Sequence, residues 1–116
     1  MSGICESLLY AEKAGLDHEK LIALLSKGGA RSFWLENCGP KMIRRDFTPG
    51  FLVEHFVKDL GMVLEECRKM NLSVPGIALT YQLYQTIMAK NHERDGIHAL
   101  MLSLEQMNGT KVRTYQ

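Results

Sequence analysis

The chain has 116 residues, of which 46% are hydrophobic and 23% charged, and its formal net charge is +1. This length and composition are typical of a single globular domain that buries its own core. Because the net charge is close to zero, the chain has no strong attraction for nucleic acid, and a DNA-binding helical domain is disfavoured. No apolar run reaches the roughly 20 residues that a membrane-spanning helix needs, so we expect no membrane segment.

The cysteines Cys5, Cys38 and Cys67 are widely spaced and contain no CxxC pair. We therefore expect neither a disulfide framework nor a zinc site, and free thiols suit a reducing, cytoplasmic setting. The N-terminal segment carries Glu6 among apolar side chains and has no basic leader, so it does not resemble a signal peptide.

The first part of the chain predicts two helices. Apolar residues recur at helical spacing in residues 3–14, namely at Ile4, Leu8 and Ala11. Gly15 follows as a helix-ending residue, and Asp17 is a typical N-cap for a second helix that stops at the glycine pair 28–29. That pair and the Ala-Arg-Ser after it have two interpretations. We favour a capped turn between helices, and the alternative is an anion site at a helix N-terminus.

A third helix is expected at residues 30–38, where Gly39 and Pro40 interrupt it, and a short helical turn follows at 41–45. This turn carries three cations, Lys41, Arg44 and Arg45. They suit a solvated helix face, and contact with a cofactor phosphate or with a partner subunit is the alternative.

The longest helix is predicted at residues 51–71. Apolar residues cover more than half of its circumference: Val53, Phe56, Val57, Leu60, Val63, Leu64 and Cys67. Such a helix is expected to lie between other helices rather than on the surface. Ser-Val-Pro-Gly at 73–76 then breaks the chain.

Two further helices complete the pattern: one ends near residue 90, and Asp95 can cap a last one, which carries Ile97, Leu100, Met101 and Leu104. The remaining residues, 108–116, read as a polar tail that is mobile at its end. We therefore predict an all-α fold, a bundle of five to six helices with a long central helix, formed by residues 1–107. Because the loops are short, neighbouring helices should be mostly antiparallel.

Few residues suggest a reactive site on their own. None of the four histidines has a second His or Cys one helical turn away, so metal binding is not expected. Neither GxGxxG nor a phosphate-binding GxxxxGK[ST] loop is present. Cys38 lies near a helix end, where greater exposure is possible, but no histidine near it in sequence could activate its thiol.

Lys58 and Asp59 stand out because they interrupt the apolar surface of the long helix. One interpretation pairs them with Glu54 and His55, one turn earlier, as exposed ion pairs worth a few tenths of a kcal/mol each. The other places a cation and a carboxylate at a cleft. Spacing alone favours the ion pairs, because structural pairs outnumber functional sites.

Four stretches give the sequence a resemblance to a known family: AEKAGLD at 11–17, LLSKGGARSFWLENCGPKMIRRDF at 24–47, PGFLVEHFVKDLGMVLEE at 49–66 and VPGIALTYQLYQ at 74–85. Together they resemble the all-helical C-terminal domain of the 3-hydroxyisobutyrate dehydrogenase family. That family includes 2-hydroxy-3-oxopropionate (tartronate semialdehyde) reductase and is related to 6-phosphogluconate dehydrogenase. The resemblance runs through nearly the whole chain in one continuous order.

The resemblance implies an oxidoreductase that uses NAD or NADP to convert a small hydroxyacid or its semialdehyde. In this family an N-terminal Rossmann domain binds the dinucleotide, and the active site lies between that domain and the helical one. By resemblance, Lys58 contacts the cofactor near its nicotinamide end, Phe51 helps to close the cleft, and Asp59 supports this arrangement.

The same resemblance places the catalytic residue outside these 116 residues. The family's general-acid lysine belongs to a GxxxKxxxN motif that should precede residue 1 by a few turns, and the Rossmann domain and a serine-glycine substrate loop also belong to that missing part. We therefore expect no catalytic residue here and no activity of the chain alone. We also expect self-association into a homo-oligomer, because the apolar long helix and the region of Trp34 offer more hydrophobic surface than a lone bundle needs. The alternative is a stand-alone helical interaction module without catalytic activity.

Overall fold

The computed structural model describes residues 1–113, and they form an all-α fold, as the sequence predicts. In chain order the helices are α1 (Ser2–Ala14), α2 (His18–Leu25), α3 (Phe33–Ile43), α4 (Val53–Lys69), α5 (Pro75–Met88), the 3-10 helix η1 (Ile97–Ala99) and α6 (Leu100–Asn108). Within the described residues, extended pairing is limited to one isolated bridge between Leu52 and Gly96.

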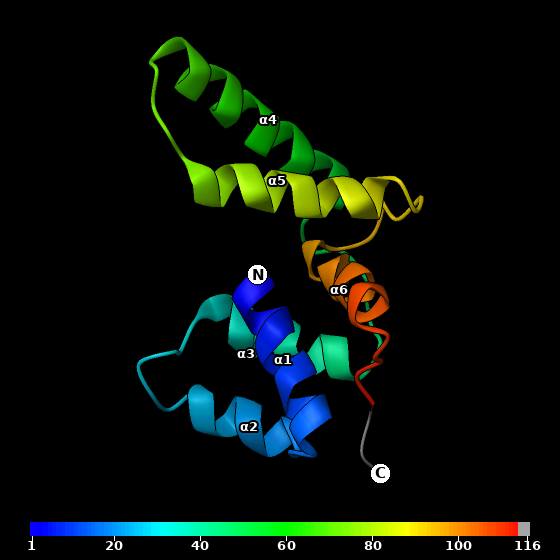
Figure 1. Cartoon of the computed structure of the whole chain (residues 1–116). Coiled ribbons are helices and arrows are strands. Elements are labelled where there is room, and N and C mark those ends of the chain that lie inside the picture. The colour runs from blue at the N-terminus through cyan, green and yellow to red at the C-terminus, as the bar shows by residue number, and fades with distance from the viewer. Residues whose placement is uncertain (114–116) are drawn as a thin grey trace.

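The helices form two groups (Figure 1). Helices α1, α2, α3 and α6 make a body, and α4 and α5 make an antiparallel hairpin that extends away from it. The molecule is therefore elongated, with extents of 49 × 32 × 25 Å. The core lies where α1, α3, α5 and α6 meet, and its fully buried side chains include Cys5, Leu8, Met42, Tyr84, Ile87, Leu100 and Met101.

The ends of the first two helices follow the local signals of the sequence. Gly15 ends α1 with a φ of 69°, in the left-handed region that suits glycine. The Asp17 side chain accepts a hydrogen bond of 3.0 Å from the backbone N–H of Lys20 and so caps α2. Both predictions are confirmed.

Helix α3 differs from the prediction, because it continues through Gly39 and Pro40 instead of stopping there. Proline removes only the bond to the carbonyl of Glu36, an exposed residue. Because Gly39 has no side chain, α3 can approach α2 closely: a Cβ at this position would lie 3.1 Å from Cδ1 of Ile22. Tertiary packing of the following turn, where Met42 is fully buried, therefore outweighs the local break.

The expectation that α4 lies between other helices is wrong. Helix α4 packs along α5 and touches η1 only at its base, so much of its apolar surface faces solvent. Met62 and Val63 are 60% and 44% exposed.

The loop before η1 fixes the base of this hairpin. No side chain caps α4. Instead, the first N–H groups of the helix, at Val53 and Glu54, donate to the carbonyls of Asp95 and Glu93 at 2.9 and 3.0 Å. The Tyr84 hydroxyl also donates to the carbonyl of Ile97 at 2.7 Å. The hairpin is thus bonded to the segment that leads into α6.

The run 41–45 is the solvated face that we favoured only at Arg44, which is exposed. Arg45, with a φ of 60°, turns back and forms a bidentate ion pair with Glu105 of α6, with N–O distances of 2.5 and 3.0 Å. The Glu105 side chain is only 7% exposed and also accepts a 2.8 Å bond from the backbone N–H of Val112. Met42 and Ile43, in the same run, are also buried.

The part of the predicted polar tail that the structure describes lies against the body. Val112 is 1% exposed, and the backbone N–H of Arg113 donates to Glu12 of α1 at 3.0 Å. The end that we expected to be mobile falls on residues 114–116, which lie outside the described residues. The domain boundary at residue 107 stays a prediction.

His98 joins η1 to the loop after α3. Its ring stacks on Phe47 at a centroid distance of 5.6 Å, and its Nε2 donates to the carbonyl of Asp46 at 2.8 Å. The Arg45 guanidinium lies 5.3 Å from the same Phe47 ring. Burial lowers the pKa of His98 below the usual range, although the bond to Asp46 opposes that shift.

We predict that Arg45→Met lowers the free energy of unfolding by about 2–3 kcal/mol, because it leaves the buried Glu105 carboxylate with only its bond to Val112. Urea denaturation measures this change. Lys69→Met is the control, since Lys69 pairs with Glu65 and Glu66 on the surface, and it should cost less than about 0.5 kcal/mol. Equal losses in both variants would contradict a special role for the buried pair.

We also predict that acidification destabilises the fold through His98. Because the folded-state pKa is lowered, the stabilising contribution is complete above the pKa of the unfolded state and is lost as the pH falls through the folded-state value. The free energy of unfolding should therefore fall from pH 7 to about pH 5, and His98→Gln should flatten that slope. His55→Gln, at an exposed position, should leave the slope unchanged; an unchanged slope in both variants would contradict the prediction.

Candidate functional site

A cavity of about 190 Å³ lies between α3, the loop before α4, and η1, and we call it the α3–η1 cavity. It contains Phe51, one of the residues that the sequence assigns to a site. Its lining residues are Phe33, Trp34, Asn37, Cys38, Lys41, Gly50, Phe51, Ile97 and His98.

One face of α3 supplies most of this wall. Phe33, Asn37 and Lys41 follow one another at intervals of four residues, so they form a single stripe along the helix. Ser32 sets the start of the helix by accepting a 3.1 Å hydrogen bond from the backbone N–H of Leu35. The Phe33 and Trp34 rings meet edge to face, with centroids 5.2 Å apart, and both remain substantially exposed.

The capped turn that we favoured at residues 28–32 fits this geometry better than an anion site. The Ser32 hydroxyl serves as the N-cap, and Arg31 pairs with Glu36 at 2.9 Å. These are the contacts of a capped turn.

Phe51, in the loop just before α4, also lines the cavity. Its ring is half-buried and packs against Phe56 with centroids 5.8 Å apart. Phe56 in turn meets the buried Tyr84 edge to face at 4.9 Å. Phe51 is thus an aromatic wall anchored to the core, with part of its surface open to a ligand.

Lys58 and Asp59 do not line this cavity. They lie on the exposed surface of α4, where their charged groups are 3.3 Å apart and their side chains are 64% and 50% exposed. The pairs expected with Glu54 and His55 do not form. Glu54 instead pairs with Arg94 at 2.7 Å, from the loop that holds the base of the hairpin.

Cys38 and His98 come together at the cavity although they are far apart in the sequence. Cys38 is buried rather than exposed, and burial raises its pKa even though the charge of Lys41 opposes that effect. Burial lowers the pKa of His98. A protonated thiol beside a neutral imidazole does not make a nucleophilic pair, so the arrangement favours binding over nucleophilic catalysis.

The sequence-based interpretation missed Lys41 and His98 as members of one site. The spacing of Phe33 and Lys41 on one helix face could have indicated the first, once α3 is taken as continuous. No local pattern connects His98 to α3, because η1 and the loop bring it there over nearly sixty residues.

We expect residues 1–113 to hold neither a metal site nor a membrane-spanning helix. Among these residues, no three His, Cys, Asp or Glu side chains gather as a metal ion would require. No helix in this range is long and apolar enough to cross a membrane.

Known proteins resemble this chain in sequence. A family model described as the NAD-binding domain of NADP-dependent 3-hydroxyisobutyrate dehydrogenase matches residues 1–104. A probable 3-hydroxyisobutyrate dehydrogenase-like 1, mitochondrial, of Arabidopsis thaliana is 46% identical over 98% of this chain and 34% of its own length. The 2-hydroxy-3-oxopropionate reductase of Escherichia coli (strain K12) is 34% identical over 97% of this chain and 38% of its own length.

A solved structure shows the same fold. The crystal structure of 3-hydroxyisobutyrate dehydrogenase from Salmonella typhimurium superposes with a TM-score of 0.80 over 87% of this chain and 35% of that one, at 20% identity. The chain thus spans about a third of the length of the relatives that it matches. Because the family model covers most of the sequence, the predicted resemblance is confirmed: the chain belongs to the 3-hydroxyisobutyrate dehydrogenase family and corresponds to its C-terminal helical domain.

Proposed function

We propose that this chain forms one wall of the cofactor and substrate cleft of an NAD(P)-dependent dehydrogenase that acts on small β-hydroxyacids. The observation that supports this most directly is the position of Phe51. It forms a wall of an open, aromatic cavity and lies seven residues before the exposed Lys58. The names of the relatives, a 3-hydroxyisobutyrate dehydrogenase-like protein and a 2-hydroxy-3-oxopropionate reductase, point to the same substrate class.

The available groups fit the nicotinamide end of such a cofactor rather than its phosphates. An aromatic ring at Phe51 and an ammonium group at Lys58 can contact a flat, polar ring and orient it. Residues 1–113 offer no glycine-rich loop for a pyrophosphate. The dinucleotide would therefore be held mainly by the Rossmann part of the longer enzyme, and the general-acid lysine would lie on the helix that joins the two domains.

Lys58 would act by orientation and charge. Hydride transfer to an aldehyde builds negative charge on its oxygen, and cations in a water-excluded cleft stabilise that charge. Asp59, 3.3 Å from the ammonium group, would hold Lys58 in place. In the isolated chain both groups are exposed, so this effect would develop only when a second domain covers them.

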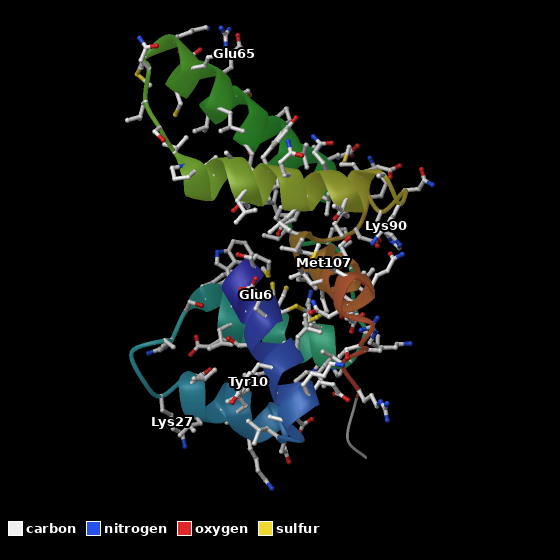
Figure 2. The ribbon with its side chains drawn as sticks, in the orientation of Figure 1. Glu6, Tyr10, Lys27, Glu65, Lys90 and Met107 are labelled. Atoms are coloured by element: carbon white, nitrogen blue, oxygen red, sulfur yellow. The ribbon has the colours of Figure 1, made fainter. Side chains whose placement is uncertain are left out.

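The α4–α5 hairpin would carry self-association into a homo-oligomer. Five large apolar side chains on it or at its turn are exposed: Met62, Val63, Met70, Leu72 and Leu79. Figure 2 shows Glu65 at the end of the hairpin that lies away from the body, and Tyr10 and Met107 on the body. An apolar surface on a projecting element suits contact with a second copy.

The same exposed surface supports the alternative function, a helical interaction module without catalytic activity. The two functions differ in what they require of Lys58, since only the dehydrogenase needs it. For the compartment we propose a reducing, cytoplasmic setting, supported by the free, buried thiols of Cys5, Cys38 and Cys67. The name of the Arabidopsis relative assigns that protein to mitochondria.

We predict that Lys58→Ala lowers kcat or raises the KM for the cofactor at least about tenfold, as loss of a charged contact should. The enzyme for this test is a fusion in which the chain replaces the matching third of the Arabidopsis relative. NADH formation from 3-hydroxyisobutyrate gives the rate, and the 116-residue chain alone should give none. Lys69→Ala is the control, because Lys69 is an exposed, paired lysine on the same helix.

Unchanged kinetics in the Lys58→Ala fusion would remove that residue from the site. An inactive parent fusion, with the Rossmann part still binding cofactor, would count against the dehydrogenase function and for the interaction module.

We predict that Val63→Glu weakens self-association at least about 30-fold, because it buries a charge in an apolar interface. Sedimentation equilibrium over a range of concentrations measures the dissociation constant. Leu24→Glu is the matched control, since Leu24 is 68% exposed on α2 of the body, and it should leave association unchanged. A parent chain that is monomeric at millimolar concentration would contradict the prediction.

A further inference from the structure

Lys41 is the only charged side chain among the residues that line the α3–η1 cavity, apart from the ionisable His98 and Cys38. Those two groups favour their neutral forms, because burial lowers the pKa of His98 and raises that of Cys38. Among residues 1–113, no carboxylate lines the cavity. The cavity therefore carries a net positive charge at neutral pH.

The three cations of the 41–45 run have different surroundings. Arg45 is neutralised by Glu105, and Arg44 lines a separate hollow together with Glu19. Lys41 is half-buried, and no carboxylate among residues 1–113 forms an ion pair with it. A half-buried ammonium group without a counter-ion, beside a cavity, is a suitable partner for an anionic ligand.

The charge of Lys41 reaches the groups around the cavity. It contributes to lowering the pKa of the Asp46 carboxyl, after the hydrogen bonds that this group accepts from Thr48. It also adds to the lowering of the His98 pKa, after the effect of burial. Asp46 is not a close counter-ion of Lys41: within the described part of the chain the two groups form no ion pair, and the Asp46 carboxylate accepts a 3.0 Å bond from the backbone N–H of Thr48.

The size and walls of the cavity limit the ligand. A volume of about 190 Å³ corresponds to roughly six water molecules, which is the size of a three- or four-carbon acid and too small for a dinucleotide. Phe33, Trp34 and Phe51 supply apolar walls for a short carbon chain. Phosphate sites, by contrast, gather several donors, such as helix N-terminal amides or a guanidinium group, and the cavity offers only one cation.

We infer that Lys41 binds the carboxylate of the small hydroxyacid, whose carbon chain lies against Phe33, Trp34 and Phe51. This inference rests on the proposed function and deepens it, because it assigns a substrate-reading residue to the helical domain. Lys41 thereby sets a preference for acids over neutral alcohols of the same size.

Binding of 3-hydroxyisobutyrate to the 116-residue chain tests the inference without any need for catalysis. Backbone amide NMR shifts should saturate at residues 33–41 and 96–98. Lys41→Met should raise the apparent Kd at least about tenfold, as loss of one charge-assisted hydrogen bond should, and Lys41→Arg should restore binding to within about threefold. The neutral amide of the same acid should bind the parent chain as weakly as the acid binds Lys41→Met.

Arg44→Met is the matched control, because it removes a nearby cation that follows the last residue of α3 and lines a different hollow. It should leave the Kd unchanged. Inorganic phosphate serves as the competing anion, and tighter binding of phosphate than of the acid would overturn the carboxylate assignment. Equal Kd values for the parent chain and Lys41→Met, or no saturable binding by the parent chain, would overturn the role of Lys41.

The fusion enzyme provides a second, separable result. Lys41→Met should raise the KM for 3-hydroxyisobutyrate at least about tenfold and leave the KM for the cofactor unchanged. An unchanged KM for the acid would overturn the inference. An inactive parent fusion would refute the proposed dehydrogenase function, and the NMR result would then still decide whether Lys41 binds a carboxylate.

Discussion

The ion pair between Arg45 and Glu105 connects parts of the chain that are sixty residues apart, and the geometry of the cavity depends on it. Arg45 has a left-handed conformation, which turns the backbone at the end of α3, and the backbone N–H of Asp46 closes this turn by donating to the carbonyl of Lys41 at 2.9 Å. The next residues then present their carbonyls inward: Asp46 accepts from the His98 ring, and Phe47 accepts from the backbone N–H of Gly96 at 2.8 Å. Because Glu105 also accepts from Val112, one buried carboxylate fixes α3, α6 and the C-terminal segment together.

The body and the hairpin differ in how they are packed. The body buries its apolar residues around α1, α3 and α6, in a core that α5 completes. In the hairpin, α5 contributes the buried Tyr84 and Ile87 to the core, whereas α4 buries little beyond its contact with α5 and is held at its base by backbone hydrogen bonds to residues 93–97. The proposed site residues lie where these two parts meet or on the hairpin itself. That is where a covering domain or a second copy could complete them, as the proposed function requires.

Local patterns in the sequence account well for the elements and poorly for the site. The Gly15 ending and the Asp17 cap were predictable because each depends on residues within one turn. The continuation of α3 through Pro40 was not, because it depends on the burial of Met42 against other helices. The pairing of Glu54 with Arg94 rather than Lys58 has the same origin, since a partner forty residues away was closer than the one a turn along the helix.

The sequence by itself determined the all-α fold, the helix order and the family, because periodicity, caps and the order of the motifs are properties of the sequence itself. It also selected Phe51, Lys58 and Asp59 by resemblance. Only the tertiary structure decided that Phe51 lines a cavity, that Lys58 and Asp59 lie exposed on α4, and that Lys41, Cys38 and His98 meet. These contacts join residues that are far apart in the sequence, so they depend on the closure of long loops. The free energy that favours them comes from core packing and the Arg45–Glu105 pair rather than from any short motif.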